Sequence, residues 1–175
     1  MRGWALAERG QVLDGIAQML AGLDEYRIAG GGSIKPSFLS LLAEAYGKVG
    51  QFKQAFNVLA EAQDLADENE ERWWQAELHR IKGELILKDN PSSESSEATA
   101  EECFRQALST AREQSSRSLE LRAAVSISRL KLRQGKSYEA RQELVRIYSW
   151  FTEGFDTADL KDAKVLLDEL GNPPQ

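Results

Sequence analysis

The sequence predicts an all-α fold built from helical hairpins that pack side by side. Apolar residues recur three and four positions apart along most of the 175 residues, which is the spacing of one helix face. No segment shows the sustained apolar and polar alternation of a half-buried strand. Strong helix formers dominate between short turn segments, and the four prolines lie in such segments. The chain is long enough for one domain with a sizeable core.

The clearest structural unit lies between Ser37 and Asp67, on either side of Gly50. Large and small apolar residues alternate along both of its halves: Leu39, Leu42, Ala43 and Tyr46, then Phe52, Ala55, Leu59 and Ala62. The spacing predicts two helices joined by a tight turn, and the alanines let a neighbouring helix approach closely. Such a hairpin cannot bury its own apolar face, so it needs copies of itself on either side.

The turn residues divide the chain into nine expected helices, at 2–9, 11–29, 35–48, 52–68, 71–89, 97–114, 117–134, 137–151 and 157–170. Eight of them form pairs within a single domain over 1–171, with pair bounds near 1–30, 34–68, 71–115 and 117–151. The ninth, at 157–170, has a polar outer face and is expected to cap the stack, and 172–175 form a tail.

The pairs superpose as an internal repeat. Their second helices share a small residue followed four positions later by a large one: Gly15 and Met19, Ala55 and Leu59, Ala100 and Phe104, Ala140 and Leu144. The first helices match at Gly3, Ala43, Gly83 and Ser128. The spacing between second helices is 40, 45 and 40 residues, and the excess predicts a mobile loop at 91–96 inside the third pair. The first copy is short, so the chain is expected to begin within a longer array.

The second copy resembles the tetratricopeptide repeat, whose pattern is Trp-x2-Leu-Gly-x2-Tyr, then Ala-x3-Phe, over about 34 residues. The resemblance implies an α-solenoid of about 3.5–4 hairpins plus the C-terminal capping helix. It also implies a non-catalytic module that presents a concave groove to a peptide or a partner domain. The repeat length near 40 keeps another type of α-solenoid as the alternative.

A narrower resemblance rests on three blocks, at 72–85, 118–124 and 150–161. These blocks are similar to the C-terminal repeat region of bacterial multidomain proteins. In that family a class III nucleotide cyclase or DNA-binding domain precedes a predicted AAA-type ATPase. The resemblance implies the alternative function of a regulatory region that docks on its own catalytic domains, and it carries over no catalytic residue.

Composition argues against several classes of protein. The net charge of −6 disfavours binding to nucleic acid or an acidic membrane. One cysteine, Cys103, and one histidine, His79, exclude an internal disulfide and a histidine-rich metal site, and both are expected to pack between helices. No apolar run is long enough to span a bilayer and no signal peptide is evident, so we expect a cytoplasmic protein without cofactor, metal or enzymatic activity.

Charge segregation supplies the candidate partner site. Ten basic and four acidic residues lie between Arg105 and Arg146, although the chain as a whole is acidic. In the tetratricopeptide register the first helices line the inner groove, which places six charged residues there: Arg80, Glu84, Lys88, Arg122, Arg129 and Arg133. Arginines on adjacent helices are suited to hold carboxylates of an acidic peptide. The alternative is that they pair with the chain's own Glu77, Glu84 and Glu120.

Other candidate sites have simpler explanations. Trp73 and Trp74 are adjacent, so we expect one to pack between pairs and the other to be an exposed anchor for a partner. Gly30–Lys35 lacks the spacing of a phosphate-binding loop and is expected to link repeats. The acidic run at 67–71 is expected to be a solvated helix start. Self-association through the apolar edge of the short first hairpin stays open.

Overall fold

The computed structural model describes residues 2–28, 35–69 and 72–171. These residues form nine α-helices and one 3-10 turn, and no strand occurs among them, which confirms the all-α prediction. The helices are α1 (Arg2–Glu8), α2 (Val12–Ile28), α3 (Lys35–Lys48), α4 (Phe52–Glu68), α5 (Gln75–Asp89), α6 (Glu94–Glu113), α7 (Arg117–Arg133), α8 (Ser137–Tyr148) and α9 (Ala158–Gly171), and the 3-10 turn η1 (Arg72–Trp74) precedes α5.

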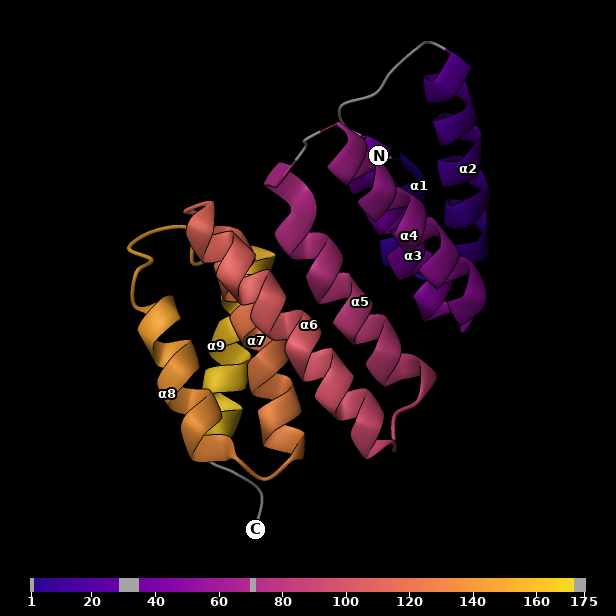
Figure 1. Ribbon diagram of the computed structural model, residues 1–175. Helices are drawn as coiled ribbons and strands as arrows, with labels where there is room; N and C mark the ends of the chain where they lie inside the picture. The colour runs from indigo at the N-terminus through magenta and orange to yellow at the C-terminus, as the bar shows by residue number, and fades with distance from the viewer. Residues whose placement is uncertain (1, 29–34, 70–71, 172–175) are drawn as a thin grey trace.

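The helices pack in the order of the chain (Figure 1). The helices α1, α3, α5 and α7 each pack against the helix that follows, which gives four pairs. Successive pairs contact each other through α2 and α3, α4 and α5, and α6 and α7. The unpaired α9 packs against α8 of the fourth pair. The first helices of successive pairs also contact one another, so α1, α3, α5, α7 and α9 form a continuous row. This row lines the candidate site.

Glycine sets the turn inside three of the four pairs. Gly10, Gly50 and Gly135 adopt φ of 88°, 72° and 75°, in the left-handed region that side chains with a Cβ disfavour. The third pair has Asn90–Ser93 at the equivalent place. The loop predicted at 91–96 is therefore wrong in its second half, since α6 already begins at Glu94. The Ser93 hydroxyl accepts a hydrogen bond from the Ser96 amide at 3.3 Å and caps the helix, which the low-complexity composition concealed.

The small residues of the repeat lie where helices approach most closely. A Cβ on Gly3 would lie 2.7 Å from the Gly15 carbonyl oxygen, and Ser128 donates a hydrogen bond to the Ala140 carbonyl at 3.3 Å. In the third pair, a Cβ on Gly83 would lie 2.5 Å from Cε1 of Phe104, which is fully buried. The internal register deduced from the sequence is thus reproduced as contacts within the first, third and fourth pairs, and in the second pair Ala43 and Ala55 belong to one buried cluster.

The last described helix, α9, packs against α7 and α8. Four apolar residues of α9 are buried against α7 and α8: Leu160, Ala163, Leu166 and Leu170. Its predicted start and end differ from the observed ones by a single residue at each end.

Three predicted features lie outside the described residues: the Gly30–Gly32 linker, Glu70 and Glu71 of the acidic run, and the tail at 172–175. Within the part of the chain that is described, no helix has the length and apolarity needed to cross a membrane.

Candidate interaction groove

One cleft of about 720 Å³ follows the row of first helices. Side chains from α1, α3, η1, α5, α7 and α9 line it. Its lining divides by chemistry into an aromatic half, from the first residues of α1 and α3 and from η1, and a charged half, from later residues of α1, α3 and α5 and from α7 and α9. We call this cleft the inner groove.

The aromatic half consists of Trp4, Phe38, Leu41, Trp73 and Trp74. Trp74 is held in place because its indole N–H donates to the Ser40 hydroxyl at 2.8 Å, and Ser40 donates in turn to the Ser37 carbonyl at 2.7 Å. Trp73 packs on it with ring centroids 5.2 Å apart and remains 48% exposed. The expectation that one tryptophan packs and its neighbour stays exposed is confirmed, and the exposed ring stands on a fixed support.

The charged half centres on Arg80 of α5. Its guanidinium contacts three carboxylates, with Glu77 at 2.7 and 2.9 Å, Glu44 of α3 at 2.8 Å and Glu84 at 3.8 Å. Burial by itself lowers the pKa of Arg80, but the neighbouring carboxylates, Glu77 first, more than offset it and raise the pKa above its ordinary value. Arg80 is therefore a fixed cation whose Nε and Nη2 are already hydrogen-bonded within the protein.

Glu77 connects two neighbouring helices of the row. Its carboxylate is only 2% exposed, accepts hydrogen bonds from Arg80 and forms an ion pair with Arg122 of α7, whose Nη1 lies 2.7 Å away. Arg122 also lies 3.7 Å from Asp159 of α9. Glu84 adds a second link between α5 and α7, because the Ser126 hydroxyl donates to it at 2.7 Å.

Ion pairs thus join every adjacent pair of first helices. The set, which we call the inner ion-pair ladder, comprises Glu8–Lys48, Glu44–Arg80, Glu77–Arg122 and Arg129–Asp162. Its rungs run from α1 to α3, α3 to α5, α5 to α7 and α7 to α9. The groove arginines Arg80, Arg122 and Arg129 therefore pair with acidic residues of the same chain, as the alternative explanation expects.

Five of the six predicted charged residues line the inner groove, namely Arg80, Glu84, Lys88, Arg122 and Arg129. Arg133 does not, and its placement there was wrong: it lies in the last turn of α7 and its Nη2 is 3.1 Å from Glu97 of α6. Hydrogen bonds from Gln134 and Arg133 lower the pKa of Glu97. The ion pair with Glu97 holds the Arg133 side chain against α6, outside the residues that line the groove.

Sequence reasoning missed Trp4, Phe38, Leu41, Glu44 and Asp159 in the lining. The internal register held a signal for one of them, since Glu44 follows Ala43 just as Glu84 follows Gly83. Asp159 lies in the first turn of α9. Its role depends on how α9 lies across α7, which spacing along the chain does not specify.

A different face of the molecule holds His79 and Cys103. His79 lines a cleft of about 380 Å³ between α4, α5 and α6, and burial, followed by the charge of Lys82, lowers its pKa. Cys103 is buried as expected, and burial raises the pKa of its thiol. Within the described ranges, no group of three or more His, Cys, Asp or Glu side chains has an arrangement that could hold a metal ion.

Comparison with known proteins adds one relative. The chain is 31% identical over 128 residues to an uncharacterized protein of Rhizobium meliloti. That match covers 73% of this chain but only 12% of the relative, which is a much longer protein. No family model matches the sequence.

Proposed function

We propose that this chain is a non-catalytic protein–protein interaction module, an α-solenoid of tetratricopeptide-like hairpins that receives a partner segment in the inner groove. The stack would comprise about four hairpins with α9 as its cap. The exposed aromatic surface carries this proposal: Trp4 and Trp73 remain 38% and 48% exposed in a cleft that side chains from five helices line. Large aromatic side chains in concave surfaces are typical anchors of binding energy.

The ion-pair ladder determines which half of the groove is available. Arg80, Arg122 and Arg129 already contact carboxylates of the same chain, so an acidic peptide would have to displace those contacts to reach them. Lys88 makes no ion pair with any described residue and lies in the same groove. We therefore assign partner anchoring to the aromatic half, with Lys88 as the group that an acidic side chain of the partner would meet.

The ladder itself would keep the groove in shape. Its rungs join first helices that are not paired in one hairpin, so they resist changes in the angle between successive hairpins. A groove of fixed curvature binds with a smaller ordering cost than one that must be assembled.

A selection experiment tests the proposal. Peptides selected from a random phage-displayed library on the intact protein would be measured against two matched variants, Trp73→Ala in the groove and Tyr138→Ala on α8. Tyr138 is 74% exposed and lies outside the groove, so it controls for the loss of an exposed aromatic ring.

Trp73→Ala is expected to weaken the selected peptides at least tenfold, about 1.4 kcal/mol, while Tyr138→Ala changes affinity less than twofold. A library that yields no binder, or binders indifferent to Trp73, would contradict groove recognition. For an acidic binder, Lys88→Ala should reduce the salt dependence of affinity, and Arg133→Ala, outside the groove, should not.

The second candidate function is the regulatory C-terminal region of a bacterial signalling protein that docks on its own cyclase or ATPase domains. The match to a bacterial relative of which this chain covers only 12% favours it. Sequencing the gene upstream of Met1 tests it: an open frame encoding an ATPase core is the expected result. A stop codon with a ribosome-binding site just before Met1 would contradict it.

A further inference from the structure

The cleft that holds His79 lies at an interface between two hairpins, and we call it the His79 cleft. It has a volume of about 380 Å³, lies between α4, α5 and α6, and shares no lining residue with the inner groove. Its lining combines apolar side chains with polar ones. The internal repeat shows that this interface differs from the interfaces before and after it.

Two positions of the first helices make the difference. The residue just before the small residue of the repeat is Leu42 in α3, Lys82 in α5 and Ile127 in α7. Leu42 and Ile127 are 1% and 3% exposed, whereas Lys82 lies at the surface. Three positions earlier, the residues of α3 and α7 are again buried and α5 has a half-buried histidine: Leu39, Ala124 and His79.

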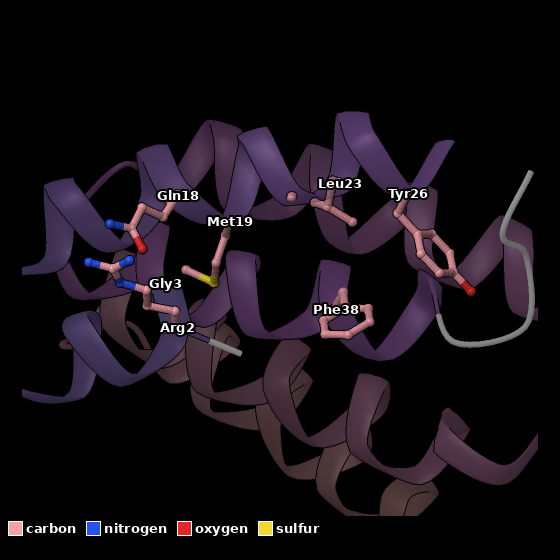
Figure 2. Close-up of a pocket in the computed structure, with 8 residues that line it drawn as sticks. Arg2, Gly3, Gln18, Met19, Leu23, Tyr26 and Phe38 are labelled. Atoms are coloured by element: carbon pink, nitrogen blue, oxygen red, sulfur yellow. The ribbon is translucent and has the colours of Figure 1, made fainter. Parts of the chain in front are cut away.

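The surroundings of Leu42 show what fills this place in the preceding interface. Leu42 belongs to one apolar cluster with three residues of α2: Ile16, Met19 and Leu23. Figure 2 shows Met19 and Leu23 along α2, opposite Phe38 of α3. Counted from the small residue of each second helix, their equivalents in α4 all line the His79 cleft: Phe56, Leu59 and Gln63. The His79 cleft is therefore the counterpart of a packed apolar cluster.

The following interface is also packed. Ile127 belongs to one apolar cluster with Phe104 and Leu108 of α6. A large apolar side chain thus closes the interfaces on both sides, and polar side chains leave the middle one open. Because these polar side chains reduce the apolar area that the interface buries, the fold itself does not require them. Departures from a protein's own structural pattern are expected at functional sites.

The polar groups at these two positions are available to a ligand. The Lys82 ammonium and the His79 imidazole make no hydrogen bond or ion pair with any residue that the structure describes. Burial, followed by the charge of Lys82, lowers the pKa of His79, so its imidazole is neutral at pH 7 and offers one donor and one acceptor. Leu59 and Leu78, 5% and 2% exposed, supply apolar surface beside them.

We propose that the His79 cleft binds a small organic acid with an apolar body, its carboxylate beside Lys82 and its body against Phe56 and Leu59. The volume of the cleft falls at the small end of the range for sites that bind such molecules. The ammonium group attracts a carboxylate, and His79, one turn away on the same helix, can donate a further hydrogen bond. The half-buried ring of Phe56 suits an aromatic body.

A carboxylate of the chain itself sets the direction of the ligand. Phe56 and Asp64, both in the lining, lie about 12 Å apart along the axis of α4. α4 and α5 run in opposite directions (Figure 1), so Phe56 lies toward Lys82 and Asp64 toward His79. The charge of Asp67, which acts on His79, agrees with this placement. Repulsion from Asp64 disfavours the reverse orientation, with the ligand's carboxylate at the Asp64 end.

Nuclear magnetic resonance tests the site directly because His79 is the only histidine in the sequence. The probe is 2-naphthoate, titrated into the untagged full chain while the imidazole signals of His79 are recorded. We expect a saturable shift with a Kd of about 1 mM or tighter. The uncharged analogue 2-naphthalenemethanol should bind at least fivefold more weakly, because it lacks the carboxylate that Lys82 attracts.

Lys82→Gln should weaken 2-naphthoate at least fivefold and remove its advantage over the alcohol. The matched control is Lys53→Gln, which removes an exposed lysine of α4 outside the cleft and should change the affinity less than twofold. Ala60→Leu adds a side chain to the lining and should weaken both probes at least fivefold. Ala21→Leu, at an exposed position of α2, should weaken neither.

No saturable shift up to about 10 mM 2-naphthoate would overturn the proposal. Equal affinity for the acid and the alcohol on the parent chain, a comparison that needs no variant, would overturn it as well, and so would unchanged affinity in Lys82→Gln. Trp73→Ala should leave the His79 shift unchanged, which separates this site from the inner groove. A shift that Trp73→Ala abolishes would assign the binding to the inner groove and overturn its assignment to the His79 cleft.

Discussion

Replacing Glu77 by glutamine tests the ion-pair ladder at its most buried rung. The carboxylate is 2% exposed and accepts hydrogen bonds from Arg80 at 2.7 and 2.9 Å and an ion pair from Arg122 at 2.7 Å. Glutamine keeps the shape and one acceptor oxygen but removes the charge. Two guanidinium groups then face each other across a site that water reaches poorly.

The size of the loss follows from what each arginine retains. Removing one partner of a buried ion pair typically costs about 3–5 kcal/mol. Arg80 keeps Glu44 at 2.8 Å, and Arg122, whose side chain is 31% exposed, keeps Asp159 and water. We therefore expect Glu77→Gln to lower the free energy of unfolding by about 2–3 kcal/mol. For a domain of this size that is a fall in melting temperature of about 4–12 °C.

Glu120→Gln is the matched control because Glu120 is equally buried, at 1% exposed. Its partners Arg112 and Arg117 have side chains 42% and 57% exposed, so water can replace the lost carboxylate. We expect a cost of about 1 kcal/mol for that variant. The two losses should therefore differ by at least about 1 kcal/mol.

Urea unfolding followed by both circular dichroism and tryptophan fluorescence measures these values, provided that the two transitions coincide. A double-mutant cycle with Arg122→Gln should give a coupling energy of about 1 kcal/mol or more between Glu77 and Arg122. Equal losses for Glu77→Gln and Glu120→Gln, or a neutral Glu77→Gln, would refute the idea that the ladder braces the row of helices.

Three further predictions concern the packed interior. Gly83→Ala should lower the free energy of unfolding by about 1–3 kcal/mol because the added Cβ would lie 2.5 Å from the Phe104 ring. Gly22→Ala should raise it by about 1 kcal/mol because the added Cβ meets nothing within 4 Å and alanine favours the helix. Urea unfolding measures both values. Burial lowers the pKa of His79 in the folded state, so the unfolded chain binds more protons near and below the ordinary histidine pKa of 6.5. The free energy of unfolding should therefore fall as the pH drops through and below 6.5. The variant His79→Gln should show a weaker dependence of this free energy on pH. At neutral pH, Cys103 should react with a thiol reagent much more slowly in the folded protein than in urea. Burial raises the pKa of its thiol and limits the access of the reagent. Equal rates in the two states would contradict its buried position.

The sequence by itself determined the elements and their pairing. Periodic apolar residues bounded by glycine and proline predict each helix because a helix forms its backbone hydrogen bonds locally. The match of Ala43 with Ala55, and of Ser128 with Ala140, also followed from spacing, since contacts within a short hairpin join residues close in the chain. The start of α6 escaped prediction because its serine-rich first turn depends on a single capping hydroxyl from Ser93.

Only the tertiary structure decided the chemistry of the groove. The residue pairs Glu44–Arg80, Glu77–Arg122 and Arg129–Asp162 join helices 33–45 positions apart in the chain, so no local spacing encodes them. Arginines that the sequence offers as free binding groups are therefore engaged by carboxylates from neighbouring hairpins. Small differences in how one helix rotates against the next, which local propensity does not fix, determine whether a charge meets solvent or an opposite charge.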